Sequence, residues 1–350
     1  MKAIFFISFM LMNILCFGQN KISNIINDEY EQGHFNGSVL VVKDGKIINR
    51  ISKGYANFQF KVPIDSNTRF PVASVTKLFT TIAILQLSEK SLVGFNDSIS
   101  KYIDSLPESC QNITVRDLLI HYSGLANEPI KAYSAKYKIN DFIKLFVSPK
   151  QTGDSIAYNY NNVDYVLLSK IIEKVTNKSY QEAIQSLILT PAKMNNTGFV
   201  QESSVIPYLA YGYHNYSFGS GKKGDTLYND RRYLSNYYGA GQMYATTQDL
   251  YLLLTALKEN KLISKATKAD YLTKVQKHVT IDWAGGEPTF GFYYNDRTYP
   301  YPILRRSGNI DGFNADIICD KDFSRIVIIL CNTDTADLSG LTKKIFNVIR

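Results

Sequence analysis

The stretch that most limits how this chain can fold begins at Phe70 and runs into a long apolar segment. Residues 78–87 are apolar on nearly every side, which is typical of a helix buried inside a protein. Ser74 and Lys77 stand just before this segment at a spacing that puts both side chains on one face of a helix. The sequence therefore predicts a buried helix that begins with a hydroxyl and an amine side by side.

Ser74 and Lys77 have a chemical use as a pair. A serine hydroxyl is a poor nucleophile until a base takes its proton, and a lysine whose pKa is lowered by burial can act as that base. The spacing alone is weak evidence, because it recurs at residues 98–101 and 220–223, where no apolar helix follows. The alternative is that Ser74 or Thr76 is an ordinary helix cap.

Length and composition set the broad class. A chain of 350 residues with 45% apolar residues predicts one large domain or two closely joined lobes. The formal net charge of +8 is spread in short clusters without a polybasic tail, so no nucleic-acid partner is expected. The four histidines are far apart and lack metal-ligand spacing, so neither a metal nor another cofactor is expected.

Residues 1–18 look like a secretory signal peptide. They carry one early charge, Lys2, and then an apolar run shorter than the ~20 residues that a membrane-spanning helix needs. We expect cleavage after Gly18 and a periplasmic or secreted protein, with an uncleaved N-terminal membrane anchor as the alternative. The mature chain keeps Cys110, Cys319 and Cys331, whose odd number and spacing predict packed or half-exposed thiols rather than a disulfide framework.

Strands are predicted near both ends of the sequence, with helices between them. The expected strands cover residues 37–42, 47–51, 290–294, 303–307, 314–319 and 325–330. The expected helices cover residues 21–33, 115–121, 140–147, 163–175, 246–257 and 338–349, and residues 201–238 read as a long surface loop. This order predicts an α/β (α+β) fold with one antiparallel sheet built from both ends and flanked by helices. The sheet lobe would span about 19–90 and 286–350, with an inserted helical lobe at about 91–285.

Acyl transfer needs a second acid or base besides Lys77, and Tyr160 is the candidate. A tyrosine is a useful base only if nearby cations lower its pKa, which Lys77 could do. Asn162 could hydrogen-bond Lys77 and a substrate carbonyl. Tyr158 competes for the role, but only Tyr160 has an asparagine two residues later. Loop packing is the alternative for Tyr160 in a chain with 25 tyrosines.

The predicted substrate site also includes Arg306, Ser307 and Gly308 on an expected strand. Because Gly308 has no side chain, a substrate could lie against the backbone there, and Arg306 could hold a substrate carboxylate. The backbone N–H of Asn309, with that of Ser74, could form an oxyanion hole. A solvated cation at a strand end is the alternative for Arg306.

Taken together, these motifs resemble the serine β-lactamase and penicillin-binding protein superfamily, close to its class C β-lactamase, D,D-peptidase and esterase branch. The resemblance covers residues 37–350 and rests on motifs in a fixed order: Phe70 to Lys77, His121-Tyr122-Ser123-Gly124-Leu125, Tyr160-x-Asn162, Gly239-Ala240-Gly241-Gln242-Met243 and Arg306-Ser307-Gly308. It implies a serine hydrolase with its site at the seam between sheet and helical lobe. Ser74 would form an acyl-enzyme, and Lys77 and Tyr160 would carry the proton.

One departure from the family concerns the third motif, which usually starts with Lys or His and here starts with Arg306. Arginine cannot carry a proton at ordinary pH, so it can only bind an anion or supply charge. The leading expectation is a hydrolase of D-amino-acid peptides (peptidoglycan fragments among them), β-lactams or small esters. The alternatives are a non-catalytic or acylation-only binding or sensor protein of the same fold, and a structural module with an accidental Ser-x-x-Lys.

Overall fold

The computed structural model describes residues 20–104, 106–150, 156–213, 233–310, 312–333 and 336–349. The predicted signal peptide, the Ser-x-x-Lys repeat at residues 220–223 and much of the predicted loop at 201–238 lie outside these ranges. Within the described ranges, no helix combines the length and the apolar character needed to cross a membrane.

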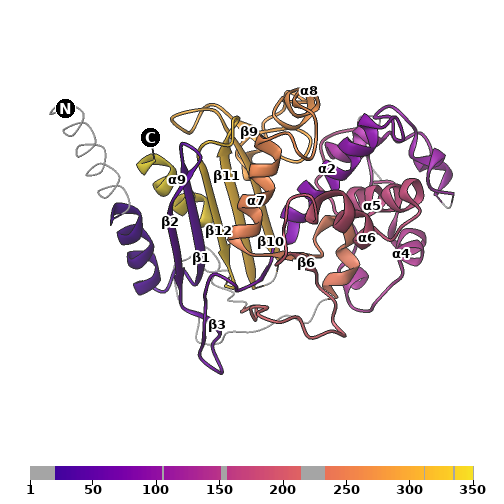
Figure 1. Ribbon diagram of the computed structural model, residues 1–350. Coiled ribbons are helices and arrows are strands. Elements are labelled where there is room, and N and C mark those ends of the chain that lie inside the picture. Colours follow the sequence, from indigo (N-terminus) through magenta and orange to yellow (C-terminus); the bar gives the residue numbers. More distant parts are fainter. Residues whose placement is uncertain are drawn as a thin grey trace.

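A seven-stranded antiparallel sheet forms one half of the molecule (Figure 1). Its strand order is β2-β1-β12-β11-β10-β9-β8, so the N-terminal hairpin pairs with the last strand. The strands are β1 (Gly37–Lys43), β2 (Lys46–Lys53), β8 (Glu287–Pro288), β9 (Tyr293–Asn295), β10 (Ile303–Ile310), β11 (Phe313–Asp320) and β12 (Ile326–Cys331). The register joins Gly37 of β1 to Cys331 of β12. This confirms the prediction of one antiparallel sheet that includes both ends of the sequence.

Both faces of the sheet are covered, because successive residues of β1 alternate between two apolar clusters. One face packs against α7 (Thr247–Lys258), which crosses β1 and β12. The other face packs against α9 (Leu338–Val348) and a helix over residues 20–31. Figure 1 shows α7 on one side of the strands and α9 on the other.

The other half of the molecule is mainly helical and is built around α2 (Thr76–Glu89). Every residue from Thr76 to Leu87 is buried, as the apolar run predicts. α2 packs against α5 (Val163–Thr176) and against η6 (Leu234–Ala240).

The remaining helical elements of the described structure, in chain order, are η1 (Ala73–Val75), η2 (Ile99–Lys101), η3 (Glu108–Cys110), α3 (Val115–Leu119), η4 (Ile130–Tyr133), α4 (Ile139–Phe146), α6 (Tyr180–Ile184), η5 (Gln185–Leu189), α8 (Lys265–Thr267), η7 (Lys268–Leu272) and η8 (Asp282–Ala284).

In the part of the chain that the structure describes, five short strands form two small sheets outside the main one, and the sequence did not predict them. They are β3 (Tyr55–Asn57) with β4 (Val62–Pro63), and β5 (Phe70–Pro71) with β7 (Met243–Ala245) and β6 (Gly198–Phe199). Strands of two or three residues are too short to display a period of two, so no alternating pattern marks them. The pairing of β5 with β7 fixes the chain directly before η1.

Some details differ from the sequence-based predictions. α2 lies within the predicted sheet lobe but packs in the helical half, whereas α7 lies within the predicted helical lobe but packs on the sheet. The strand expected at 290–294 begins at Tyr293, because the Phe290 N–H donates to the Tyr271 carbonyl and Gly291 has a φ of +92°. The three cysteines of the described region are free and buried, in agreement with the prediction.

Candidate active site

Ser74 lies on η1, immediately before α2 begins. Its neighbour Ala73 has a φ of +45°, a left-handed conformation that costs a residue with a Cβ about 1–2 kcal/mol. η1 packs against β10 of the main sheet. The Ser74 hydroxyl therefore lies where the helical half meets the sheet, the position that the family resemblance implies.

The amine of Lys77 reaches Ser74 from the first turn of α2. Its Nζ lies 3.1 Å from Ser74 Oγ, 2.7 Å from Asn162 Oδ1 and 2.9 Å from the Ala240 carbonyl oxygen. The lysine side chain is fully buried, and this burial lowers the pKa of Lys77. A lysine in such a place gives up its proton more readily than one in water, so it can act as a base.

Tyr160 approaches the same hydroxyl from the segment before α5. It donates a hydrogen bond of 2.7 Å to Ser74 Oγ, and Lys77 Nζ lies 4.9 Å from the centre of its ring. Burial opposes ionisation of the phenol, but the positive charges of Lys77 and Arg306 outweigh burial and lower the pKa of Tyr160. Ser74 is thus flanked by two groups that can accept its proton.

Tyr158 faces a different partner. Its hydroxyl lies 2.6 Å from the hydroxyl of Tyr293 on β9. Burial raises the pKa of Tyr158, so this phenol is a weaker acid than usual. The structure brings Tyr160, and not Tyr158, to Ser74.

The amide of Asn162 is oriented by Glu128, a residue that the sequence did not single out. Asn162 Nδ2 donates to Glu128 Oε1 at 2.7 Å, which leaves Oδ1 to accept from Lys77. Tyr133 also donates to this carboxylate, and its ring stacks on Tyr237 with centroids 3.8 Å apart. The contacts of Glu128 with Asn162 and of Tyr133 with Tyr237 join segments far apart in the sequence, so no local pattern marks them.

Arg306 does not take the position expected for a clamp on a substrate carboxylate. Its side chain is only 3% exposed, and Nε donates to the Ser74 backbone carbonyl at 2.8 Å. Its Nη2 is buried and has no hydrogen-bond partner among the described residues. The guanidinium therefore supplies positive charge to Lys77 and Tyr160 from within the protein, which also excludes the alternative of a solvated strand-end cation.

Gly308 is the point where the turn that carries Ser74 touches the sheet. A Cβ at this position would lie 2.2 Å from the Val72 carbonyl oxygen and 2.9 Å from the Ser74 nitrogen. The glycine therefore makes room for this turn rather than for a substrate, which corrects the predicted reason for it. Ser307 alternates to the opposite face of β10, next to its cross-strand partner Asp316.

A cavity of about 180 Å³ lies beside Ser74. Its lining residues are Ala73, Ser74, Tyr160, Asn162, Tyr237, Ala240, Gly241, Asn309 and Ile310. Of the predicted substrate-binding residues, Asn162 and Asn309 therefore line the cavity, whereas Arg306, Ser307 and Gly308 do not. Pockets for drug-sized ligands hold roughly 300–1,000 Å³, so this cavity suits a compact group.

Trp283 stands next to Tyr160 and is the single tryptophan of the chain. Its ring centre lies 5.0 Å from that of Tyr160 and 5.5 Å from that of Tyr293. The side chain is 57% exposed. Nothing in the sequence singles it out, because η8 has only three residues and is too short to show a periodic pattern.

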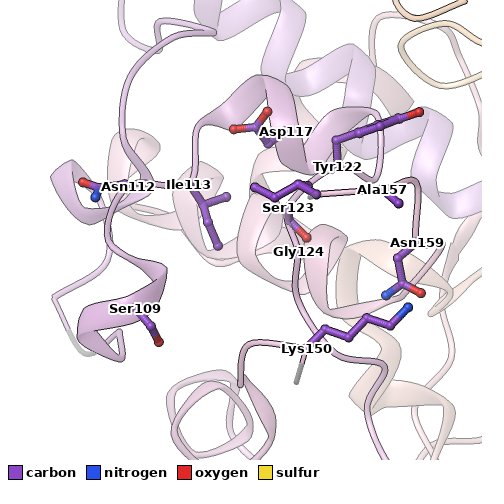
Figure 2. Close-up of a pocket in the computed structure, with 11 residues that line it drawn as sticks. Ser109, Asn112, Ile113, Asp117, Tyr122, Ser123, Gly124, Lys150, Ala157 and Asn159 are labelled. Carbon is purple, nitrogen blue, oxygen red and sulfur yellow. The ribbon is translucent and has the colours of Figure 1, made fainter. Parts of the chain in front are cut away.

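A second cavity, of about 290 Å³, borders the segment that leads to Tyr160. Figure 2 shows its lining, with the polar ends of Lys150 and Asn159 pointing toward one another and with Ser123 in the wall. Neither Ser74 nor Lys77 lines it.

Among the described residues, no group of three or more His, Cys, Asp or Glu side chains could hold a metal ion.

Comparison with known proteins gives a consistent result. The family model described as Beta-lactamase matches residues 22–348. Penicillin-binding protein 4* of Bacillus subtilis (strain 168) is 30% identical over 321 residues, which cover 87% of this chain and 69% of that protein. Teichoic acid D-alanine hydrolase of Staphylococcus aureus is 34% identical over 305 residues, which cover 81% of this chain and 73% of that protein.

A solved structure confirms the predicted fold. The crystal structure of FmtA from Staphylococcus aureus matches with a TM-score of 0.77 and 28% sequence identity, over 93% of this chain and 85% of that chain. The chain belongs to the beta-lactamase family and is a serine hydrolase related to the penicillin-binding proteins.

Proposed function

We propose that Ser74 is the nucleophile of a two-step hydrolysis that passes through an acyl-enzyme. The observation that carries the proposal is the meeting of two basic groups at Ser74 Oγ, with Lys77 Nζ at 3.1 Å and the Tyr160 hydroxyl at 2.7 Å. Both groups have lowered pKa values. A base whose pKa is brought toward the working pH is the more effective proton acceptor.

In the first step, Ser74 Oγ attacks the carbonyl carbon of an ester or amide, and its proton passes to Tyr160 or Lys77. The bond to the leaving group breaks, and the leaving oxygen or nitrogen takes up that proton. The backbone N–H groups of Ser74 and Asn309 hold the negative charge on the carbonyl oxygen. Loss of one such donor costs about 3–4 kcal/mol of transition-state stabilisation.

In the second step, water attacks the carbonyl carbon of the acyl-enzyme. The same two side chains accept a proton from this water and return one to Ser74 Oγ as the carboxylic acid leaves. Asn162, held by Glu128 at 2.7 Å, keeps Lys77 in place through both steps.

The proposed substrate is an ester or amide of a small D-amino acid, with D-alanyl esters first. The relative named teichoic acid D-alanine hydrolase, at 34% identity, supports this class. The cavity of about 180 Å³ beside Ser74 suits an acyl group as small as alanyl. The Glu128 carboxylate next to Asn162 favours a substrate that carries a positive charge, such as a free amino group.

The test is a substrate panel run on wild type and Ser74→Ala. It contains a D-alanyl ester, the matching L-alanyl ester, a D-alanyl-D-alanine peptide and a chromogenic cephalosporin. We expect fastest hydrolysis of the D-alanyl ester, weak or no hydrolysis of the cephalosporin, and no activity in Ser74→Ala. Fast turnover of the cephalosporin would replace the proposed substrate class by β-lactams.

A fluorophosphonate probe for active serines tests the nucleophile separately. We expect it to label wild type and not Ser74→Ala. The control is Ser98→Ala, which alters the other Ser-x-x-Lys of the described region and should keep the label. Labelling that survives Ser74→Ala would remove Ser74 as the nucleophile. Acylation by an ester that releases one equivalent of the alcohol, with no release of the carboxylic acid over hours, would identify an acylation-only binding or sensor protein.

We further propose that the mature protein is periplasmic or secreted. The support is residues 1–18, with one early charge followed by a short apolar run. N-terminal sequencing of the protein exported by a bacterial host should begin at Gln19. A membrane-bound protein that still begins at Met1 would indicate an N-terminal anchor instead.

A further inference from the structure

Two titratable side chains that the proposed chemistry does not use are buried together beside Tyr160. His121 Nδ1 lies 2.8 Å from Asp164 Oδ2, and the two residues are 3% and 0% exposed. Burial of such groups carries a desolvation cost even when they are paired. A hydrophobic pair of similar size would avoid this cost, so the placement of the pair calls for an explanation.

The imidazole of His121 packs directly on the phenol ring of Tyr160. The two ring centres are 4.5 Å apart, and the ring of Tyr165 lies 5.3 Å from the imidazole. His121 Nε2 is buried and has no hydrogen-bond partner among the described residues. The imidazole therefore acts on Tyr160 by ring contact, and its orientation depends on the hydrogen bond at Nδ1.

The His121 backbone also holds the segment that carries Tyr160. Its carbonyl oxygen accepts from the N–H of Asn159 at 2.9 Å. His121 has a φ of +59°, a left-handed conformation that is unfavourable for a residue with a Cβ and needs support from its surroundings. His121 thus touches the Tyr160 segment with both its backbone and its ring.

Asp164 holds the imidazole from the first turn of α5. Its Oδ1 accepts from Ser123 Oγ at 2.6 Å, and its backbone N–H donates to Asn161 Oδ1 at 2.8 Å. The carboxyl group is therefore bonded on one side to the 121–125 segment and is placed on the other by the start of α5. It connects the two segments between which Tyr160 lies.

The stretch from Tyr160 to Asp164 makes three contacts in succession. Tyr160 reaches Ser74, Asn162 reaches Lys77, and Asp164 reaches His121, whose ring returns to Tyr160. We propose that His121 and Asp164 are positioning residues that hold the Tyr160 hydroxyl at Ser74. This inference rests on the proposed role of Tyr160 and adds the device that keeps it in place.

The pair adds no net charge next to the phenol. Burial lowers the pKa of His121 and raises the pKa of Asp164, and Lys77 and Arg306 also oppose a charged imidazole. One shared proton then leaves the pair neutral as a whole. The positive field of Lys77 and Arg306 on Tyr160 is therefore preserved. The titratable groups that face the pair are Lys77, Glu128, Tyr158, Tyr160, Tyr165 and Arg306.

The chain offers a matched control for a substitution at Asp164. Asp249 also lies in the first turn of a helix and is 2% exposed, and burial raises its pKa. It accepts from the Asn196 N–H at 2.7 Å and from Thr197 Oγ1 at 2.9 Å, so it takes no part in the Tyr160 network. Asp164→Asn and Asp249→Asn thus make the same change, from a carboxyl group to an amide, in similarly buried surroundings.

The experiment measures the single-turnover reaction of Ser74 with the fluorophosphonate probe, together with the melting temperature of each variant. The probe phosphonylates the Ser74 hydroxyl and releases fluoride, and the rate of this reaction is the measure of acylation in the comparisons below. We expect both substitutions to lower the melting temperature, and only Asp164→Asn to slow acylation. The expected loss is about tenfold or more at unchanged probe affinity, since a misplacement of about 1 Å can cost about 10²-fold. Wild-type acylation in Asp164→Asn, or an equal loss in Asp249→Asn, would overturn the inference.

A double substitution shows whether Asp164 acts through Tyr160. If it does, Asp164→Asn will slow acylation in wild type but not in a Tyr160→Phe background. Equal losses in both backgrounds would mean a general structural role and overturn the inference. Should Asp164→Asn fail to fold, Ser123→Ala is the second variant. It removes the 2.6 Å hydrogen bond to Asp164, together with the 3.2 Å bond that Ser123 Oγ accepts from the Leu125 N–H, and is expected to slow acylation in the same direction. Wild-type acylation in that variant would count against the inference.

The same assay separates this inference from the proposed function. If Tyr160→Phe alone leaves acylation unchanged, the proposed role of Tyr160 fails, and the inference fails with it. If Tyr160→Phe slows acylation while Asp164→Asn and Ser123→Ala do not, only the inference fails.

Discussion

The Tyr160 hydroxyl donates to Ser74 Oγ over 2.7 Å, although Tyr160 stands 86 residues further along the chain. Tyr158, two positions earlier, bonds to Tyr293 instead. Two tyrosines of one short segment thus have different hydrogen-bond partners, and only one of them contacts the nucleophile. Which of the two reaches the nucleophile is decided by the start of α5 and by the 121–125 segment that packs against it.

The first prediction compares these two tyrosines. Tyr160→Phe removes a proton acceptor, so kcat for the D-alanyl ester should fall by about 10²- to 10³-fold while KM changes little. Tyr158→Phe should keep kcat within a few-fold of wild type, because its hydroxyl does not touch Ser74. Steady-state kinetics on purified variants is the measurement. A larger loss in Tyr158→Phe than in Tyr160→Phe would reverse the assignment.

The second prediction concerns pH and Arg306. Before either Lys77 or Tyr160 can accept the Ser74 proton, the pair must release one proton, and the positive charge of Arg306 favours that release by lowering both pKa values. Arg306→Met removes this charge. The acid limb of the profile of kcat/KM against pH should therefore move to higher pH. Arg306→Lys, which keeps the charge, is the control, and an unmoved limb in Arg306→Met would contradict the prediction.

The third prediction concerns the contact between β10 and η1. A methyl group in Gly308→Ala would collide with the Val72 and Ser74 backbone, which cannot rotate away as a side chain can. We expect a folded protein by circular dichroism whose acylation rate is lower by about 10²-fold, because the nucleophile is displaced. Gly94→Ala, whose new methyl would meet only the side chain of Asp97, should acylate normally.

The fourth prediction uses Trp283 as a reporter. Because it is the single tryptophan and its ring lies 5.0 Å from that of Tyr160, it is close to any acyl group on Ser74. Adding the fluorophosphonate probe should change the intrinsic fluorescence at the rate at which the probe phosphonylates Ser74. Ser74→Ala should show no change under the same conditions. An identical change in both proteins would mean that the signal comes from binding elsewhere.

Parts of the site could be predicted from the sequence where residues with a chemical role stand close together in the chain beside a recognisable helix. Ser74 and Lys77 share one turn next to an apolar helix, and Tyr160 and Asn162 stand directly before another. Glu128 and Trp283 could not be predicted, because their positions depend on how distant segments pack together. The location of Arg306 on a strand was predictable, but whether its side chain faces the cavity or the interior depends on what packs against β10.

In the fold, as in the site, local sequence predicts some features, whereas others depend on contacts between distant segments. β1 and β12 are short runs rich in Val, Ile and Leu, and clear turns join β1 to β2 and β11 to β12, so the sequence reveals these strands. Helix α7 has an apolar face, but its sequence does not state whether that face covers the sheet or other helices. Such assignments need the tertiary contacts themselves, since amphipathic helices of either lobe look alike.

Asn36 and Asn332, at the ends of two neighbouring central strands, hydrogen-bond across 296 residues of chain. The ribosome therefore synthesises the whole helical half before it synthesises β12, the strand that pairs with β1. Until then β1 has β2 on one side and an unpaired edge on the other, and contacts this distant in sequence form slowly. Hydrolytic activity should consequently appear only after β12 has been synthesised and has paired with β1.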